Sequence, residues 1–182
     1  MPEEKSMYTV YVGMGSNIEA EANIARAFGL LLRRLSVTAV SPFYRSQAAG
    51  AEEAPDFTNG AFAAETDLSP RALKYELLRG IENALGRRRT ADKNASRPID
   101  LDLALYGALV IDEPGLTVPD PGLRRYPFVA LPILALAPDI VLPDSGERLR
   151  DVFPDRPEHY GLELLPGFSA ELLSRLERAA GS

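Results

Sequence analysis

Two aspartates separated by one residue are the first feature of the sequence that could support chemistry. Asp100 and Asp102 lie in an alternating apolar run, residues 99–106, of the kind that forms a β-strand. Because side chains two apart on a strand share a face, both carboxylates project together, with Cα atoms about 6.5–7 Å apart. A divalent cation would stabilise both acids at once, and oxygen-only ligands favour Mg²⁺ or Mn²⁺ over Zn²⁺. The alternative is a solvated acidic face, with the intervening leucines forming the core.

A basic segment precedes the aspartates in an otherwise acidic chain. Against the single acid Asp92, residues 87–97 carry these cations: Arg87, Arg88, Arg89, Lys93 and Arg97. Arginine binds phosphate oxygens bidentately and Mg²⁺ bridges phosphates, so the acids and arginines together indicate a site for a nucleotide polyphosphate. The alternative for the three consecutive arginines is a solvated helix end, where cations interact favourably with the helix dipole. Nucleic-acid binding is poorly supported, because no aromatic residues are interleaved with the cations.

The composition excludes several other chemistries. The chain has 182 residues, no cysteine and one histidine, so thiolate nucleophiles, iron–sulfur clusters, zinc fingers and most hydrolase triads are excluded. That histidine, His159, lies in a Pro-rich tail and is expected to be a surface residue. The net charge of −6 argues against a general nucleic-acid binder. The glycine-rich turn at residues 13–17 lacks the P-loop lysine, which excludes a Walker-type kinase. Without a membrane-spanning run or a signal peptide, a cytoplasmic protein is expected.

The surrounding pattern predicts the elements that would position these residues in one domain. Alternating or short apolar runs predict strands at residues 9–12, 37–44, 57–66 and 99–106, with residues 109–111 pairing against the last of them. Apolar spacing of three and four predicts helices at residues 19–35, 70–85, 125–136 and 169–178. Residues 45–55 show no periodicity and are expected to form an exposed loop, of a length that often carries function.

The order of these motifs resembles the 6-hydroxymethyl-7,8-dihydropterin pyrophosphokinase (HPPK) family of folate biosynthesis. The match is collinear over residues 8–153 and rests on seven blocks: Tyr-Val-Gly-Met-Gly-Ser-Asn (11–17), Ser-Pro-Phe-Tyr-Arg-Ser (41–46), Ala-Pro-Asp-Phe-Thr-Asn-Gly-Ala (54–61), Ile-Glu-Asn-Ala-Leu-Gly-Arg (81–87), Arg-Pro-Ile-Asp-Leu-Asp-Leu (97–103), Leu-Thr-Val-Pro (116–119) and Leu-Ala-Pro (136–138). The resemblance implies an α+β fold, a ferredoxin-like sandwich with helices packed on a mainly antiparallel sheet. It implies a catalytic domain at residues 1–155 and a C-terminal extension at residues 156–182, expected to be a short helix on or beside the domain.

The resemblance also implies a reaction, the Mg²⁺-dependent transfer of pyrophosphate from ATP to a pterin alcohol. The implied ligands of two Mg²⁺ ions are Asp100 and Asp102, and the implied catalytic arginines are Arg87, Arg89 and Arg97. The nucleotide site is expected to contain Glu82, Lys93 and Arg97. The pterin site is expected to contain Ser46, Gly50, Phe57, Asn59 and Phe128, in which two rings sandwich the heterocycle and an amide reads its edge. The expected partners are these small molecules, without nucleic acid or membrane, and association with other folate-pathway enzymes is an open option.

Several positions depart from the family pattern and leave alternatives open. Asp120 stands in place of a histidine, Tyr126 in place of an arginine, Asn94 in place of a tryptophan and Lys93 in place of an arginine. The acid at position 120 is expected to weaken ATP binding. The alternatives are a pyrophosphokinase for another hydroxymethyl heterocycle, a non-catalytic pterin- or nucleotide-binding module, and a structural partner of another folate enzyme.

Overall fold

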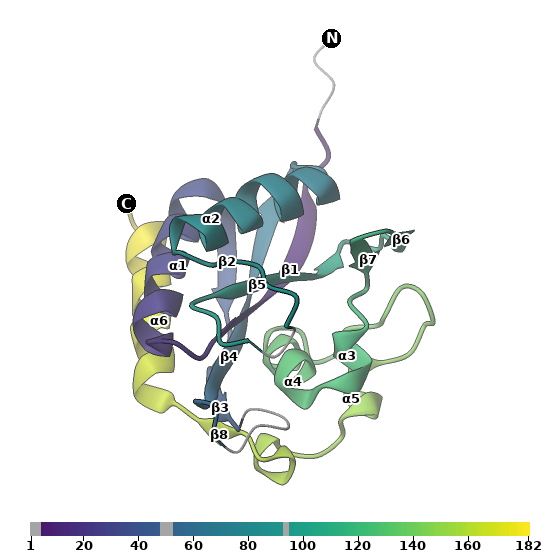
Figure 1. Ribbon diagram of the computed structural model, residues 1–182. Helices are drawn as coiled ribbons and strands as arrows, with labels where there is room; N and C mark the ends of the chain where they lie inside the picture. Colours follow the sequence, from purple (N-terminus) through teal and green to yellow (C-terminus); the bar gives the residue numbers. More distant parts are fainter. Residues whose placement is uncertain (1–4, 48–52, 93–94) are drawn as a thin grey trace.

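The computed structural model describes residues 5–47, 53–92 and 95–182, and an antiparallel sheet runs through its centre (Figure 1). The sheet contains β1 (Tyr8–Ser16), β2 (Ser36–Val40), β3 (Tyr44–Ser46), β4 (Phe57–Thr66), β5 (Asp100–Tyr106) and β8 (Glu163–Leu164). The strand order is β5-β1-β4-β3-β8, with β2 also paired to β4, and every pair is antiparallel.

Helices cover both faces of this sheet (Figure 1). One face carries α1 (Ala20–Arg34), the π-helical η1 (Ala72–Leu78) that continues into α2 (Arg79–Ala84), and α6 (Pro166–Ala180). The other face carries α3 (Gly122–Arg125), α4 (Pro127–Leu136) and α5 (Leu149–Val152). The remaining described elements are a hairpin of β6 (Ile111–Glu113) and β7 (Leu116–Val118), and the 3-10 turn η2 (Pro157–Tyr160).

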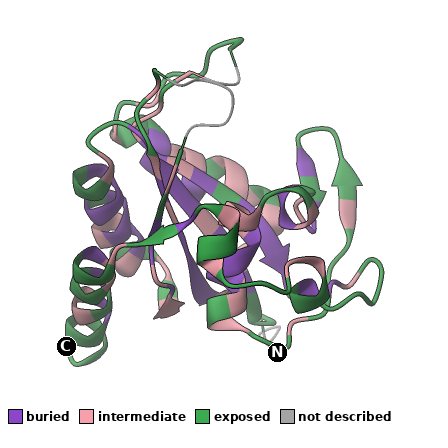
Figure 2. Ribbon diagram, turned by 90° about the horizontal axis from the view of Figure 1, so that it is seen from below, coloured by how far each residue is buried: buried purple, intermediate pink, exposed green. Residues whose placement is uncertain are grey.

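The side-chain alternation of β1 explains why both faces are covered. Val10, Val12 and Met14 are buried in the core that includes α1, η1, α2 and α6, whereas Tyr11 packs against the core of α3, α4 and α5. Figure 2 shows buried residues along the central strands and on the inner sides of the helices. A strand that is apolar on both sides needs cover on both sides, and the two helical layers provide it.

The order of elements confirms the prediction of an α+β fold with helices on a mainly antiparallel sheet. With β2 and β3 counted as one interrupted strand, the chain follows the βαββαβ order of a ferredoxin-like fold. The strand expected at residues 37–44 is divided because Pro42 has no N–H to donate to a ladder. The pairing expected for residues 109–111 is wrong. Residues 111–113 pair with 116–118 instead, across a turn in which Gly115 has a φ of +79°.

The C-terminal segment, residues 156–182, lies against the sheet. Strand β8 pairs with β3, and α6 packs on α1 and β2. The division of the chain near residue 155 stays a prediction. Within the described ranges, no helix is both long enough and apolar enough to cross a membrane.

Candidate active site

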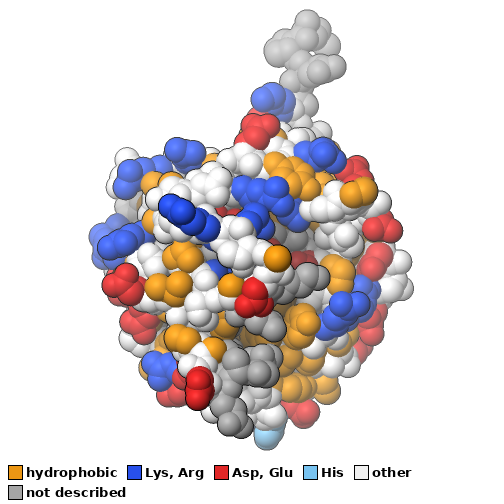
Figure 3. All heavy atoms as spheres, viewed as in Figure 1, with side chains coloured by type: hydrophobic (Ala, Val, Ile, Leu, Met, Phe, Trp, Pro, Cys, Tyr) orange, Lys and Arg blue, Asp and Glu red, His pale blue; other side chains and the backbone are white. Residues whose placement is uncertain are grey.

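A cleft of about 570 Å³ is lined by β1, β4 and β5 of the sheet and by α3 and the first turn of α4. The residues predicted from the sequence that line it are Ser46, Phe57, Asn59, Arg97, Asp100, Asp102 and Phe128. Glu82, Arg87 and Arg89 lie beside the cleft and connect to it through Asp100. Gly50, Lys93 and Asn94 fall outside the described residues. In the space-filling view, Lys and Arg side chains cluster near the centre of the face, where η1 and α2 pass (Figure 3).

Glycines on β1 keep the floor of the cleft open. The turn expected at residues 13–17 is instead the end of β1, which continues to Ser16. Gly15 lies between Asp100 on β5 and Asn59 on β4. A Cβ atom at Gly15 would lie 2.7 Å from the Asn59 Oδ1 atom, so no larger residue fits without movement. A glycine inside a strand is a known sign of close approach, and that signal could have identified Gly15 from the sequence.

Three aspartates give the cleft an excess of negative charge. Asp100 and Asp102 project from one face of β5, and Asp120, whose backbone N–H donates to the Ala104 carbonyl oxygen of β5 at 2.9 Å, also lines the cleft. The Asp102 carboxyl faces the solvent of the cleft, yet the surrounding protein displaces much of its water. This desolvation, followed by the charges of Asp100, Asp120 and Glu82, raises the pKa of Asp102 to about 7. Burial also raises the pKa of Asp120, although its Oδ1 atom accepts a hydrogen bond from the Gly122 N–H at 2.6 Å.

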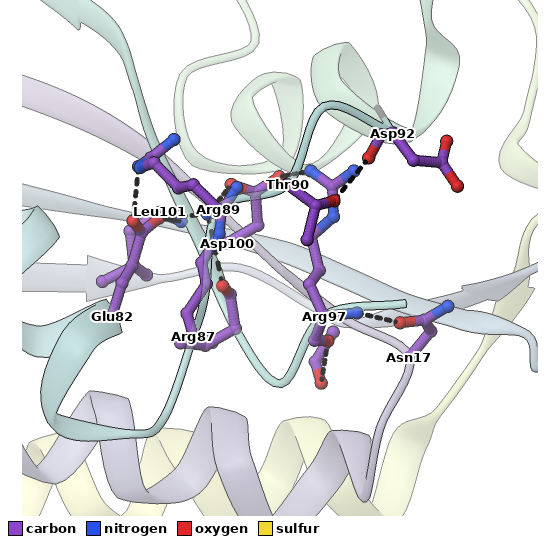
Figure 4. Close-up of polar contacts among 11 residues, drawn as sticks. Asn17, Glu82, Arg87, Arg89, Thr90, Asp92, Arg97, Asp100 and Leu101 are labelled. Atoms are coloured by element: carbon purple, nitrogen blue, oxygen red, sulfur yellow. Dashed lines mark hydrogen bonds and ion pairs between the residues drawn. The ribbon is translucent and has the colours of Figure 1, made fainter. Parts of the chain in front are cut away.

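A buried carboxylate organises the arginines beside the cleft (Figure 4). The Glu82 side chain is only 2% exposed and pairs with Arg87 at 2.5 Å and Arg89 at 2.8 Å. It also accepts the Leu101 backbone N–H at 2.8 Å, which ties α2 to β5. Burial raises the pKa of Glu82, and the hydrogen bond from Leu101 and the charge of Arg87 oppose that rise. Glu82 therefore holds two cations next to the aspartate pair.

Both oxygens of Asp100 are occupied by arginine (Figure 4). Oδ1 lies 2.5 Å from the Arg87 Nη1 atom, and Oδ2 lies 2.9 Å from the Arg97 Nη1 atom. Asn17, the residue directly after β1, holds Arg97 in place, because the Arg97 backbone N–H donates to the Asn17 Oδ1 atom at 2.8 Å. The sequence indicates Ser16 or Asn17 only as a helix cap, and no local pattern points to this contact, which spans 80 positions in the chain. Asn17 thus links the end of β1 to the cation that meets Asp100.

Aromatic and amide groups line the other part of the cleft. The Asn59 Nδ2 atom donates to Ser46 Oγ at 3.3 Å, which joins β4 to β3. Phe57 and Phe128 both line the cleft, from β4 and α4. The ring of Tyr126 stacks on Phe128 with centroids 5.2 Å apart and planes at 19°. This part of the cleft can hold a flat heterocycle with polar edges.

The aspartate pair fits a Mg²⁺ ion that is also bound by phosphate. Within the described parts of the chain, no cluster of three or more acidic, histidine or cysteine side chains could hold a metal. Mg²⁺ in nucleotide sites is commonly bound by one or two carboxylates, with phosphate oxygens and water completing the octahedron. Asp100 and Asp102 supply such a pair, and a bound cation would offset both the desolvation and the neighbouring negative charges that raise the pKa of Asp102.

Comparisons with known proteins agree with this chemistry. The family model described as 7,8-dihydro-6-hydroxymethylpterin-pyrophosphokinase (HPPK) matches residues 11–138. A Haemophilus influenzae protein named 2-amino-4-hydroxy-6-hydroxymethyldihydropteridine pyrophosphokinase is 37% identical over 76% of this chain and 88% of its own length. A Pseudomonas aeruginosa protein of the same name is 38% identical over 87% of this chain and 97% of its own length. The folic acid synthesis protein fol1 of Schizosaccharomyces pombe is 35% identical over 87% of this chain and 22% of its own length.

Proposed function

The chain belongs to the HPPK family and is a pyrophosphokinase of folate biosynthesis, and from this premise we propose that it transfers pyrophosphate from ATP to 6-hydroxymethyl-7,8-dihydropterin with Mg²⁺. The resemblance drawn from the motifs is thereby confirmed at the level of the family. ATP as the donor, Mg²⁺ as the cofactor and the roles of individual residues are the parts that we propose.

The observation that carries this proposal is the position of Asp100 and Asp102 between the two parts of one cleft. Arg97 and the Glu82 network lie on one side of the pair, where phosphates would be neutralised. Phe57, Asn59 and Phe128 lie on the other side, where a pterin would stack. A transferring group must lie between its donor and its acceptor, and in this cleft that place is next to the aspartates.

The proposed reaction is an in-line displacement at the β-phosphorus of ATP. The hydroxymethyl oxygen of the pterin forms the new P–O bond and its hydroxyl proton is released to solvent, while the bond from the β-phosphorus to the α–β bridging oxygen breaks and AMP leaves. Such reactions depend mainly on positioning and on electrostatic stabilisation of phosphate charge, and we assign no general base. Mg²⁺ held by Asp100 and Asp102 would supply part of that stabilisation.

The protein residues have distinct proposed roles in this step. Arg97, Arg87 and Arg89 neutralise phosphate charge, and they are already gathered beside the cleft by Asp100 and Glu82. Phe57 and Phe128 orient the pterin plane, and Asn59 reads its polar edge. Because Asp100 is paired with two arginines, these cations must turn toward phosphate when the aspartate turns toward a metal.

The direct test of the metal assignment is the pair of variants Asp100→Asn and Asp102→Asn. Each removes one carboxylate charge while keeping the side-chain shape, so pyrophosphate transfer should fall below detection. In EDTA at pH 8, Asp102→Asn should melt no lower than the wild type, because the Asp102 carboxylate of the wild type is desolvated and lies near the charges of Asp100, Asp120 and Glu82. Turnover close to the wild-type rate in either variant would rule out a paired-aspartate metal site.

A further inference from the structure

The C-terminal segment contacts the pterin side of the cleft through the backbone of β3. This segment lies beyond residues 11–138, the part that the family model matches. In β8, Leu164 pairs with Tyr44 and Glu163 with Arg45. The Leu165 N–H then donates to the Phe43 carbonyl oxygen at 2.9 Å. Three successive residues of the segment are therefore paired with residues 43–45.

Ser169 in α6 completes this attachment. Its Oγ atom accepts the Phe43 N–H at 2.8 Å and donates to the Leu165 carbonyl oxygen at 2.7 Å. Both backbone polar groups of Phe43 are therefore bonded to the C-terminal segment. The buried ring of Phe168 meets the buried ring of Phe43 edge-on, with centroids 5.4 Å apart.

Strand β3 carries this contact into the cleft. It has only three residues, and it lies between β4 and β8 in the sheet. Its last residue, Ser46, accepts the hydrogen bond from the Asn59 amide. Without β8, β3 would be a three-residue edge strand, and short edge elements are among the first to open locally.

The same segment also forms a wall close to the cleft. Residues 160–163 line a second cleft of about 560 Å³ that shares Ser46, Gln47 and Phe128 with the candidate active site. The C-terminal segment thus reaches the pterin side by two routes, through β3 and through the residues common to both clefts. Within the described residues, the side-chain hydrogen bonds of Glu82 and Asp100 run to Arg87, Arg89, Arg97 and the Leu101 backbone, and not to β3 or the C-terminal segment.

We propose that residues 163–169 are a positioning element for the pterin, which they hold in register by clamping β3. The inference rests on the proposed function, since it assumes that Asn59 reads the pterin edge. An amide that reads a heterocycle must keep one orientation, and Ser46 at the end of β3 fixes that of Asn59. The contact of residues 163–169 with β3 therefore affects binding of the pterin and leaves binding of the nucleotide unchanged.

The test uses the full chain with Ser169→Ala, which removes the acceptor for the Phe43 N–H. Binding of 6-hydroxymethyl-7,8-dihydropterin is measured by calorimetry in the presence of Mg²⁺ and α,β-methylene-ATP, whose carbon bridge prevents transfer. We expect the pterin Kd to rise roughly fivefold, the change that corresponds to about 1 kcal/mol for one hydrogen bond. The Kd of the ATP analogue should stay within about twofold, because the side chains around Asp100 are not touched.

Amide hydrogen exchange supplies a second readout on the same variant. The amides of residues 43–46 should exchange faster in Ser169→Ala, and Ser169→Thr should restore both their protection and the pterin Kd. Ser174→Ala is the matched control, because Ser174 lies on the same helix and its hydroxyl accepts a hydrogen bond from Arg178, which is also in α6. It should leave both readouts as in the wild type.

A second variant tests the packing contact between α6 and Phe43 separately from the hydrogen bond of Ser169. Phe168→Leu removes the ring contact with Phe43 without adding a polar atom. An unchanged pterin Kd in both Ser169→Ala and Phe168→Leu would overturn the inference, and so would an equal loss of affinity for the pterin and the ATP analogue. A wild-type protein that binds no pterin would contradict the proposed function itself.

Discussion

At the level of single residues, the negative charge of the cleft is concentrated on Asp100, Asp102 and Asp120. The first two have a proposed partner in Mg²⁺. Asp120 stands where the family pattern has histidine, and its carboxyl accepts a backbone hydrogen bond from Gly122. It therefore adds an acid at a place where ATP phosphates are expected.

Replacing this acid should strengthen nucleotide binding. Asp120→Asn keeps an oxygen that can accept the Gly122 N–H but removes the charge. We expect the KM for ATP to fall roughly fivefold at low salt, since two unit charges about 4 Å apart in water interact by about 1 kcal/mol. The difference should shrink at high salt.

Comparing Asp120→His with Asp120→Asn separates the effect of removing the negative charge from the effect of adding an imidazole ring. Steady-state kinetics with ATP as the varied substrate provides the comparison. If the KM for ATP is unchanged or higher in Asp120→Asn, Asp120 does not oppose ATP in the way proposed.

The residue types of the site could be read from the sequence, but their connections could not. The period of two on a strand is enough to place Asp100 and Asp102 on one face. The bond of Glu82 to the Leu101 N–H, 19 positions away, and the bond between Asn17 and Arg97, 80 positions apart, require α2, β1 and β5 to be assembled first. Such contacts carry no local pattern, so only the fold reveals them.

At the level of elements, β1 passes between the aspartates and the pterin residues without a side chain in the way. Gly15→Ala should weaken acceptor binding, because the added carbon would push on the Asn59 amide from 2.7 Å. We expect the KM for the pterin to rise at least roughly tenfold, because displacing the Asn59 amide by a few tenths of an ångström would weaken its hydrogen bonds to the pterin edge. The KM for ATP should change much less.

Gly13→Ala is the comparison for this variant. Among the described residues, the atom that a carbon added there would approach within 4 Å is the Asp102 carbonyl oxygen, at 3.9 Å, so a smaller effect is expected. Equal effects of the two variants on the pterin KM would show that strand propensity, and not the contact with Asn59, is responsible.

Helix α3 is tied to the loop between α4 and α5 by a bidentate ion pair. Arg124 donates to both oxygens of Asp144, at 2.8 and 3.0 Å, and these hydrogen bonds lower the pKa of Asp144 below its ordinary value of 3.8. A lowered folded-state pKa means that the pair stabilises the protein above pH 3.8 and that this contribution disappears as the pH falls further. Because both side chains are about one-third exposed, screening by solvent limits the contribution to about 1 kcal/mol.

Asp144→Asn should therefore lower the Tm at neutral pH by roughly 2–4 °C and have progressively less effect in acid. Asp139→Asn is a suitable control, because Asp139 is 83% exposed in its pair with Arg150 and should contribute little. Thermal unfolding followed over a pH series makes the comparison. A Tm difference that persists at low pH would contradict the assignment to the ion pair.

Helices and strands could be predicted where the spacing of apolar residues alone determines the structure. The strand at residues 57–66 and the helices α1 and α6 follow from apolar spacing. The pairing of β6 with β7 depended on the turn at Gly115, and the division of the strand after residue 40 depended on Pro42. The π-helical turns of η1 have no sequence signature, because apolar spacing does not distinguish them from an α-helix.

At the scale of the whole molecule, metal and nucleotide should bind together. Asp100 is paired with Arg87 and Arg97, so Mg²⁺ alone must compete with two cations, whereas ATP offers those cations new partners. Ligands that bind the folded state raise the Tm by mass action. We expect Mg²⁺ with ATP to raise the Tm more than Mg²⁺ alone and ATP in EDTA combined. A rise with Mg²⁺ alone that equals the rise with both would contradict this coupling.

The α+β architecture and the family follow from the sequence as a whole, whereas the proposed reaction requires one cleft to hold both substrates. The most direct measurement is the formation of AMP from ATP and Mg²⁺, with and without 6-hydroxymethyl-7,8-dihydropterin, while the pterin diphosphate is quantified in the same reaction. We expect AMP and pterin diphosphate in equal amounts, and neither product without the pterin. Binding of ATP and Mg²⁺ without pterin-dependent AMP would contradict the proposed reaction.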